Sequence, residues 1–546
     1  MFKRLTAWEL LGLLLVIVAA LLTLAFIGAE LLGIGETNSR GILLLEYVAL
    51  LPAIVLVLRN EKAVGRNSHR VERSIALGLI LAGFVALTLP LAWALDLGVY
   101  QADESVYLFQ ARLIEDGQLY LQDPPEIAPA DLHYTHEIIH NGKWFGKYPI
   151  GWPALLSIGM LTGAAWLVNP LLGLVLLWLT HAVGREVLSP AQASWGALLL
   201  LLSPVFSLNT IGFMSHVLAG VLVAAATLFY FKYAADSRRL WMIGLLACIA
   251  AGVVVRPFTM ACVGVVLGGS SIFRLRRDAR RAVEFCGVSL VFAGLAATAM
   301  AAQHYVLTGD FWVSPYGLGP DGDIRELAVG SDNPLRALIP RIGIRVVDTL
   351  AASFPLLLPL ALYALWRRRD NRDVWLLAAI FGVLIVGHWL NPVKSGSPVG
   401  ERFYFEGLFA AALLAAEGWK QVVSVYAVRA WLDRGLFCAL ALIAVAMSAK
   451  YSATEIWSYR RGATVLADAA EDPPFAEGVV FVEASSLLPD SHRYNLNRPG
   501  DRVLYLPDPG PVRRDGILPH VPWNHRAVLR VDPATGTAIW TLGESP

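Results

Sequence analysis

DLGVYQADESVYLFQARLIEDGQLYLQDPPEIAPADLHYTHEIIHNGKWFGKYPIG, residues 96–151, is the stretch of this sequence that decides its fold. It is polar and aromatic, it lies between long apolar segments, and it carries Asp103 and Glu104 near its start and Lys147 near its end. Charged groups are costly in hydrocarbon and are therefore expected at the water interface or along a cavity. Carboxylates beside a membrane, followed by a cation at the next span, suggest chemistry on a lipid-borne anion. The alternative is an ordinary loop in which Asp103 caps a helix and Lys147 snorkels to the surface.

Composition places the chain in a membrane. Of its 546 residues, 56% are hydrophobic and only 16% are charged, and the mean hydropathy is +0.56. This is too little polar surface for a water-soluble globule, and the many long apolar runs predict an all-α polytopic membrane protein. The formal net charge is only +1, so no overall basic field points to nucleic acid as a partner.

About thirteen apolar runs are long enough to be read as membrane spans. The segment 152–166 is also apolar, but it is short and contains Pro153 and Gly159, so we expect a partly inserted or interfacial helix there. The predicted spans are approximately 8–34, 42–58, 75–97, 168–184, 191–209, 214–231, 240–255, 257–273, 283–306, 343–366, 374–390, 404–420 and 433–451.

The positive-inside rule sets the expected orientation. When 152–166 is not counted as a span, the Lys and Arg clusters between spans all fall on one side, which is then the cytoplasmic side and holds the N-terminus. The loops 96–151, 307–342 and 391–403 and the tail are left on the exported face. We therefore expect a multi-pass protein of the inner (plasma) membrane. The clusters are Lys3 and Arg4, Arg59 to Arg73, Arg185, Arg238 and Arg239, Arg274 to Arg281, Arg367 to Arg369, and Arg429 to Arg434.

Three regions follow from these patterns. Residues 1–74 form an N-terminal pair of spans, 75–452 the main membrane domain, and 453–546 a small exported C-terminal domain. In the last region the apolar runs shrink to strand length and alternate with Pro, Gly and Asp turns, which predicts an α/β domain. Its expected role is to cap the membrane domain or to offer a surface for an acceptor.

The first exported loop is predicted to begin with a helix. Between Asp103 and Ile114 the apolar residues recur at helical spacing, and Asp103 is expected to be the N-cap. An amphipathic helix that starts with two carboxylates would lie flat on the bilayer and hold them at the depth of a lipid phosphate. It would also place a general base near a reacting sugar.

The end of the loop fits the HExxH pattern at His136 to His140, which on a helix would bind zinc. We reject that interpretation because Asn141 and Gly142 follow at once, and this pair is the strongest short-range signal for a two-residue β-hairpin. On a strand, His136 and His140 stand about 13 Å apart and cannot share a metal. The hairpin register places His136 opposite Lys147, and the second strand ends with Lys147 at the membrane surface.

Three later features also fall on the exported face. Arg256 lies between two apolar runs with no room for a real loop, and Arg402 begins a later span. The planar fork of arginine suits phosphate oxygens, so both are candidate phosphate ligands. His216, at the start of another span, also fits an ordinary interface residue. The further candidate site residues are Tyr107, Tyr148, His216 and Tyr404.

An exported loop that opens with Asp103 and Glu104, continues as an amphipathic helix and closes on a Lys-x-Pro motif at Lys147 resembles the GT-C superfamily of integral-membrane glycosyltransferases. Within it the chain is most similar to glycosyltransferase family 39, the protein mannosyltransferase and aminoarabinose transferase branch, from about residue 75 to 420. Two departures are visible. The family's Lys-Pro-Pro has Tyr148 at its centre here, and its acidic position in the second exported loop is matched by Ser215 and His216.

The resemblance implies a GT-C-like catalytic domain that moves a monosaccharide from a polyprenyl-phosphate carrier to an exported acceptor, with inversion of the sugar. Asp103 would be the base, and Glu104 would orient the acceptor or another side chain. Lys147 with Arg256, joined by Arg402, would hold the leaving phosphate. This single displacement needs no covalent intermediate.

The implied partners are the lipid-linked sugar donor, a lipid, glycan or protein acceptor, and membrane lipids. No cofactor is expected, no metal site is assigned, and the resemblance leaves a divalent metal open. Two other functions also stay open: a lipid-linked saccharide flippase or transporter, which predicts charges near the middle of spans, and a non-catalytic scaffold on a GT-C-like domain.

Overall fold

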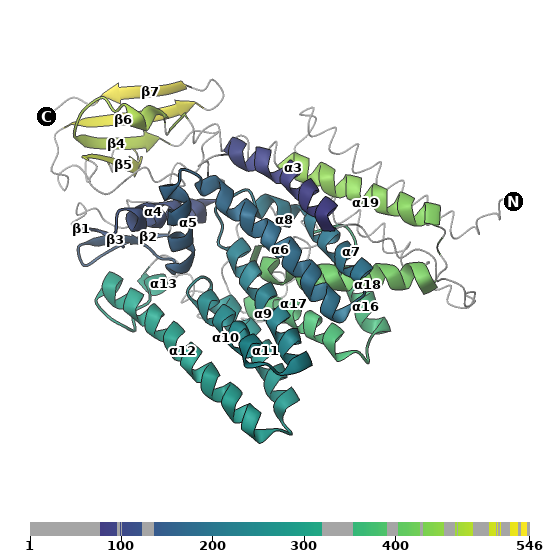
Figure 1. Ribbon diagram of the computed structural model, residues 1–546. Coiled ribbons are helices and arrows are strands. Elements are labelled where there is room, and N and C mark those ends of the chain that lie inside the picture. Colours follow the sequence, from purple (N-terminus) through teal and green to yellow (C-terminus); the bar gives the residue numbers. More distant parts are fainter. Residues whose placement is uncertain are drawn as a thin grey trace, which may run out of the picture.

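The structure is a computed structural model. It describes residues 77–95, 99, 101–122, 136–318, 353–389, 402–425, 428, 430–451, 465–466, 468–483, 502–508, 510, 514, 525–532 and 537–542. The predicted N-terminal pair of spans, 1–74, lies outside the described residues. Figure 1 shows most helices gathered in one bundle, with a small sheet over one end of it, next to α4 and α5. The helices are α3 (Leu77–Leu95), α4 (Ala102–Glu115), α5 (Gly151–Leu161), α6 (Ala165–Val187), α7 (Pro190–Leu201), α8 (Pro204–Asn209), α9 (His216–Asp236), α10 (Arg239–Val253), α11 (Pro257–Leu275), α12 (Ala279–Thr308), α13 (Pro315–Leu318), α16 (Leu357–Arg367), α17 (Arg372–Trp389), the 3-10 helix η1 (Arg402–Gly407), α18 (Leu408–Val425) and α19 (Ala430–Tyr451).

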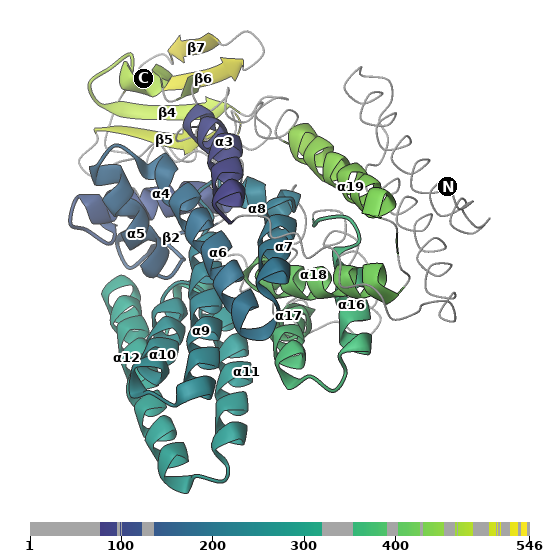
Figure 2. The ribbon, with the colours of Figure 1, turned by 45° about the vertical axis from the view of Figure 1, so that its right-hand side comes forward.

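The chain is a multi-pass membrane protein. Five segments of the described chain are long and apolar enough to cross a membrane. Figure 2 shows that α12 lies along the outer edge of the bundle and reaches far from the sheet. As expected from Pro153 and Gly159, the apolar segment that follows Lys147 is a short helix, α5. The five segments are Ala165–Val187, His216–Asp236, Pro257–Leu275, Ala279–Thr308 and Arg402–Val425.

The predicted span 191–209 is wrong as a single helix. It is divided into α7 and α8, because Pro204 cannot continue the hydrogen bonding of the preceding helix and instead starts the next one. The predicted span 343–366 is described only from residue 353, and its helix begins at Leu357 after the left-handed Leu356 (φ +67°).

The hairpin predicted at Asn141 and Gly142 is confirmed. β2 (Glu137–His140) pairs antiparallel with β3 (Lys143–Gly146), and both turn residues have positive φ, as a two-residue turn of this class requires. The short β1 (Leu121–Gln122) pairs with the other edge of β3. The register continues beyond the strands, where the Lys147 amide donates to the His136 carbonyl at 3.1 Å. The HExxH segment is therefore a strand.

The C-terminal region forms a second sheet, in the strand order β5-β4-β6-β7. The strands β5, β4 and β6 are parallel, and β7 pairs antiparallel with β6. This is the β content expected for the last residues of the chain. The strands are β4 (Gly478–Glu483), β5 (Val503–Pro507), β6 (Arg526–Asp532) and β7 (Thr537–Leu542).

The sheet covers α4. Phe109 and Leu113 of this helix are completely buried and pack with Trp144 of the hairpin and with Phe481 and Leu504 of β4 and β5. The expectation that α4 lies flat on the bilayer is therefore wrong, since its apolar face meets protein. The sequence shows that this face is apolar but not which surface covers it.

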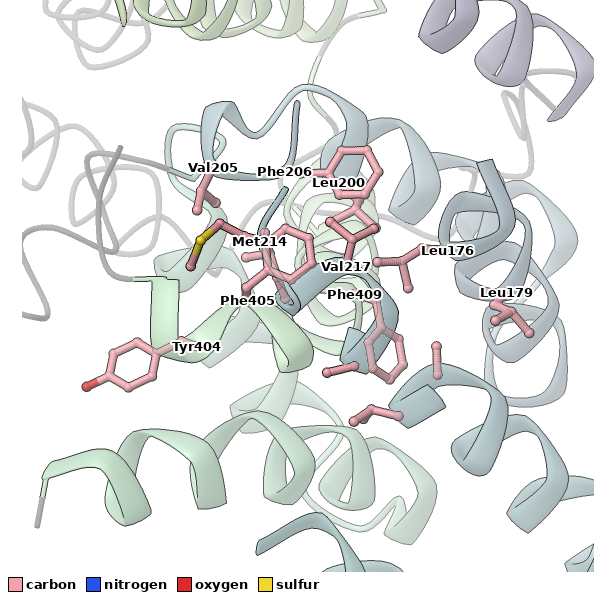
Figure 3. Close-up of a cluster of buried hydrophobic side chains, with 14 of the residues drawn as sticks. Leu176, Leu179, Leu200, Val205, Phe206, Met214, Val217, Tyr404, Phe405 and Phe409 are labelled. Atoms are coloured by element: carbon pink, nitrogen blue, oxygen red, sulfur yellow. The ribbon is translucent and has the colours of Figure 1, made fainter. Parts of the chain in front are cut away.

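A large apolar core lies beneath the start of α9. Figure 3 shows Phe206, Met214, Val217 and Phe405 clustered there, while Tyr404 extends away from the cluster. The rings of Phe206 and Phe405 are stacked, with centroids 6.2 Å apart. This packing fixes η1 against the start of α9, so that the polar residues flanking the two segments have set positions.

Candidate active site

Five chain segments bring the candidate residues to one end of the bundle. They are the first turn of α4, the chain leaving β3, the start of α9, the turn before α11, and η1. The close approach of α5 to the turn before α11 depends on Gly151, whose amide donates to the Val254 carbonyl at 2.8 Å. A Cβ at Gly151 would lie 2.6 Å from that same carbonyl oxygen, which is too close for any side chain.

Asp103 is at the centre of the first polar cluster. Its carboxylate accepts a hydrogen bond from the Tyr148 hydroxyl, forms an ion pair with Arg402 (Nη1 to Oδ2, 2.5 Å) and contacts His136 (Nε2 to Oδ1, 3.1 Å). Asp103 is 6% exposed. It does not cap the helix as expected, because α4 begins at Ala102 and its N-cap is Gln101. Asp103 instead lies in the first helical turn, where the helix dipole also favours a negative charge.

Lys147 and Asp103 are connected through His136. The Lys147 Nζ lies 2.7 Å from His136 Nδ1, and the opposite ring nitrogen faces Asp103. A protonated lysine can only donate, so Nδ1 accepts and Nε2 carries the proton that is donated to Asp103. Lys147 is 3% exposed and lies near the rings of Tyr148 and Tyr316, at 5.3 and 5.7 Å. It is thus inside the site, not at the surface as a snorkelling anchor.

The charges of this cluster keep Asp103 ionised. Burial opposes ionisation, but the charge of Arg402, the hydrogen bond from His136 and the charge of Lys147 outweigh it and hold the pKa of Asp103 well below its ordinary value. Burial, together with the charge of Asp103, raises the pKa of Tyr148 well above its ordinary value. Asp103 is therefore a carboxylate and Tyr148 a neutral hydroxyl donor at any physiological pH.

Glu104 binds the backbone of the segment that precedes α9. It is fully buried, and its Oε1 accepts the Phe213 amide at 3.0 Å. The same segment is held by Asn169, which donates to the carbonyl of Met214 at 3.1 Å, and by Trp152, which donates to the carbonyl of Phe213 at 2.7 Å. Glu104 thus positions the start of α9.

A second cluster contains Arg256 and His216. Both contact Glu406 Oε1, Arg256 through Nε at 2.7 Å and His216 through Nδ1 at 2.9 Å. Glu406 and His216 are fully buried. An acidic side chain therefore lies beside His216, and it is Glu406, from a distant part of the sequence. Arg256 is an ion-paired group here, not a lone cation.

Ser215 and two tyrosines link the clusters. The Ser215 hydroxyl lies 3.0 Å from the Tyr107 hydroxyl and accepts from Arg256 Nη1 at 3.3 Å. The Tyr107 ring packs on the Tyr148 ring with centroids 4.4 Å apart. Burial raises the pKa of Tyr107 to about 12, so it too remains a neutral hydroxyl. The remaining candidate, Tyr404, packs edge-on against Phe381 and joins neither cluster through these contacts.

Several buried polar atoms around these clusters have no hydrogen-bond partner among the described residues. They include Gln101 Nε2, Arg402 Nε, His216 Nε2 and Glu406 Oε2. Unpartnered buried polar groups are rare in folded proteins, and a binding site for a polar ligand is one explanation for them. Donors and acceptors are both present, which suits the hydroxyl groups of a sugar.

The sequence did not reveal His136, Gln101, Ser215 or Glu406 as site residues. The register of the hairpin placed His136 beside Lys147 and was the signal that could have identified it. For Glu406 the only local signal is its position one helical turn after Arg402.

The clusters do not suit a divalent metal. In the described part of the chain, no three His, Cys, Asp or Glu side chains are grouped as metal ligands. Asp103 is surrounded by Arg402, His136 and Tyr148, whereas a hard cation needs several oxygen ligands. We therefore derive no chemical step through a metal.

Comparison with known proteins identifies the fold. Scans against protein-family models and curated proteins find no match. Among solved structures, ArnT from Cupriavidus metallidurans bound to undecaprenyl phosphate matches with a TM-score of 0.54 and 15% identity, covering 84% of this chain and 94% of that one. Its apo state matches with a TM-score of 0.51 over the same shares at the same identity. The Archaeoglobus fulgidus oligosaccharyltransferase in complex with zinc and sulfate matches with a TM-score of 0.50 and 12% identity, covering 83% and 67%. The chain has the fold of the GT-C glycosyltransferases.

Proposed function

We propose that this chain, on its GT-C fold, transfers a monosaccharide from a polyprenyl-phosphate carrier to an acceptor on the exported face of the inner membrane. The observation that carries the proposal is the buried Asp103 carboxylate, held ionised by Arg402 and His136 at the end of the bundle where the loop 96–151 meets the spans. The ArnT structure with undecaprenyl phosphate supports a carrier of this class.

Asp103 is the proposed general base. The acceptor, a hydroxyl or similar nucleophile on an exported lipid, glycan or protein, attacks the anomeric carbon opposite the phosphate. The new bond forms as the carbon–oxygen bond to phosphate breaks, and the electron pair leaves with the phosphate. The acceptor proton passes to Asp103, and the anomeric centre is inverted. A carboxylate with a lowered pKa is a weak base, so we expect it to take the proton late, once the nucleophile has become acidic.

The leaving phosphate is assigned to Lys147 and Arg402. Arg402 uses Nη1 for Asp103 while its buried Nε has no hydrogen-bond partner among the described residues, so it can bind a second anion. Lys147 is connected to the same carboxylate, because its Nζ contacts His136, which in turn contacts Asp103. Charge-assisted hydrogen bonds of this kind stabilise the charge that develops on the phosphate. Arg256 forms an ion pair with Glu406. It is proposed to position Tyr107 through its hydrogen bond to Ser215.

The proposal is tested first in a deletion strain whose envelope glycans and lipid-linked sugars are compared with wild type by mass spectrometry. We expect one monosaccharide to disappear from an envelope lipid, glycan or protein and the polyprenyl-phosphate-linked form of that sugar to accumulate. Lipid extract from that strain is then the donor, and its membranes the acceptor, for purified protein in detergent.

Detergent solution separates the enzyme from a transporter. It contains no two compartments, so a flippase has nothing to do there, whereas a transferase still moves the sugar. Transfer with release of polyprenyl phosphate supports the proposal. No transfer by folded protein, with a donor that accumulates in the deletion strain, would favour the transporter.

A further inference from the structure

A cavity of about 700 Å³ lies at the opposite end of α11 from Arg256. It is formed by the last turns of α11 and α16 and the first turn of α17, with Tyr230 of α9 also lining it. The helix α11 has 19 residues and at 1.5 Å per residue is about 28 Å long. Its lining residues lie in its last two turns, so most of that length separates the cavity from Arg256. The cavity is thus separate from the candidate active site, at the end that the loop charges predict to be cytoplasmic.

Positive charge dominates the lining. Four arginines face two aspartates there. Two of the arginines are fixed in place. Arg274 donates from Nε to the Tyr230 hydroxyl at 2.7 Å and pairs through Nη2 with Asp373 at 2.5 Å. Arg368 pairs through Nε with the fully buried Glu417 at 2.6 Å. Each guanidinium has five N–H donors, so both retain donors for an anion.

The other two arginines are exposed at the rim. Arg372 is the first residue of α17, where the helix dipole adds positive potential, and it has no ion pair among the described residues. Arg367 ends α16 and lies over the ring of Trp366 at 5.9 Å. The lining therefore combines two guanidinium groups held by ion pairs with two at exposed positions, an arrangement that matches the several oxygens of a phosphate.

Exposed aromatic side chains on α11, α16 and α17 indicate the depth at which the cavity lies in the membrane. Phe273, which lines it, is 53% exposed, Trp366 is 51% exposed and Trp375 is 49% exposed. Aromatic residues of this kind gather at the boundary between hydrocarbon and water. A phosphate bound in the cavity would lie at headgroup depth, with apolar surface beside it for acyl chains.

We propose that this cavity binds the phosphate of an anionic membrane lipid, at a site independent of the one used by the sugar donor. The recognised group is a phosphate, and the source is the lipid bilayer, because the apolar rim gives a lipid contacts that a free anion cannot make. Free phosphate could satisfy the same arginines, so the test must distinguish the two.

The test is lipid binding measured by native mass spectrometry on the purified full-length chain in neutral detergent. The probes are short-chain phosphatidylglycerol, short-chain phosphatidylcholine and inorganic phosphate. We expect phosphatidylglycerol to bind well above phosphatidylcholine and inorganic phosphate to compete only weakly. Phosphatidylglycerol should bind to R367Q/R372Q at least about tenfold more weakly than to wild type, because charge-assisted contacts are lost. The control R277Q/R280Q removes the same charge from the loop after α11 and the first turn of α12, at exposed positions outside the cavity lining, and should bind as wild type.

Three results would overturn the proposal: equal weakening in the control, which would mean diffuse surface attraction; equal binding of phosphatidylcholine; and displacement of the lipid by an equal concentration of inorganic phosphate. If R367Q/R372Q does not fold, the single variant R372Q, at an exposed position, takes its place with R277Q as control. The readout is binding, so the result does not depend on whether the chain is a transferase.

Discussion

Arg402 Nη1 lies 2.5 Å from Asp103 Oδ2, and both side chains are largely buried. The pair joins α4, the first helix of the loop 96–151, to η1, far along the chain. It has an electrostatic consequence, because burial alone would favour the protonated acid and Arg402 is the strongest of the charges that reverse this. The ionisation state of the proposed base therefore depends on Arg402.

Replacing Arg402 should change the pH dependence of transfer. The lowered pKa of Asp103 means that its stabilising ion pair is fully present above its ordinary pKa of about 3.9 and is lost only as the pH falls through the lowered value. In Arg402→Gln the effect of burial is no longer offset by this charge, so the pKa of Asp103 should rise. The acid limb of the rate profile should move to higher pH, as measured by initial rates in detergent. An acid limb that stays in place would show that Arg402 does not control the base.

Lys147 should matter for the donor. We expect Lys147→Met to raise the KM for the lipid-linked donor about ten- to a hundredfold, the loss expected for one charge-assisted contact. Lys143→Met is the matched control, because Lys143 begins β3, the strand that Lys147 directly follows, and donates to the Val306 carbonyl at 2.6 Å, away from His136. A similar rise in the control, or no rise in either variant, would remove Lys147 from the phosphate site.

Arg256 and Glu406 should behave as a coupled pair in stability. Arg256→Met leaves the Glu406 carboxylate buried without its ion pair, which should cost about 3–5 kcal/mol. Adding Glu406→Gln should recover part of this loss, with a coupling energy on the order of 1–3 kcal/mol. The free energy of unfolding in detergent, measured for wild type, both single variants and the double variant, checks this. Additive losses would mean that the two side chains do not interact.

Local sequence signals predicted part of this structure well. The Asn141 and Gly142 turn fixed the hairpin and its register, and through them the position of Lys147 beside His136. Turn chemistry acts between neighbouring residues, so the sequence contains it. The partners of Asp103 and Arg256 could not be predicted in this way, because Arg402 and Glu406 reach them only through the packing of η1 against α9.

The same limit explains the prediction for α4 that failed. Helical spacing correctly predicted a helix with an apolar face, but that spacing is the same for a face that meets lipid and one that meets protein. The covering strands, β4 and β5, come from the C-terminal region and bury Phe109 and Leu113. Pro204, by contrast, is a local signal that should have divided the predicted span 191–209.

The orientation of the chain remains a prediction from loop charge. In a variant without its four native cysteines, Gln118→Cys should react with an impermeant thiol reagent in intact cells, and Arg277→Cys should not. Both positions are exposed and lie at opposite ends of the helical domain. Permeabilised cells provide the control, since both should react there. Labelling of Arg277→Cys in intact cells would place the Asp103 clusters on the wrong face for an exported acceptor.

The most direct test of the central claim is the transfer rate of Asp103→Asn in detergent, with the donor lipid extract and the acceptor membranes of the deletion strain. The change keeps the size of the side chain and removes its ability to accept a proton, so transfer should fall at least about a hundredfold. Asp116→Asn, an exposed position at the end of the same helix, should transfer as wild type. Thermal unfolding shows whether both variants are folded. A folded Asp103→Asn protein that transfers at a rate close to that of Asp116→Asn would contradict the assignment of Asp103 as the base.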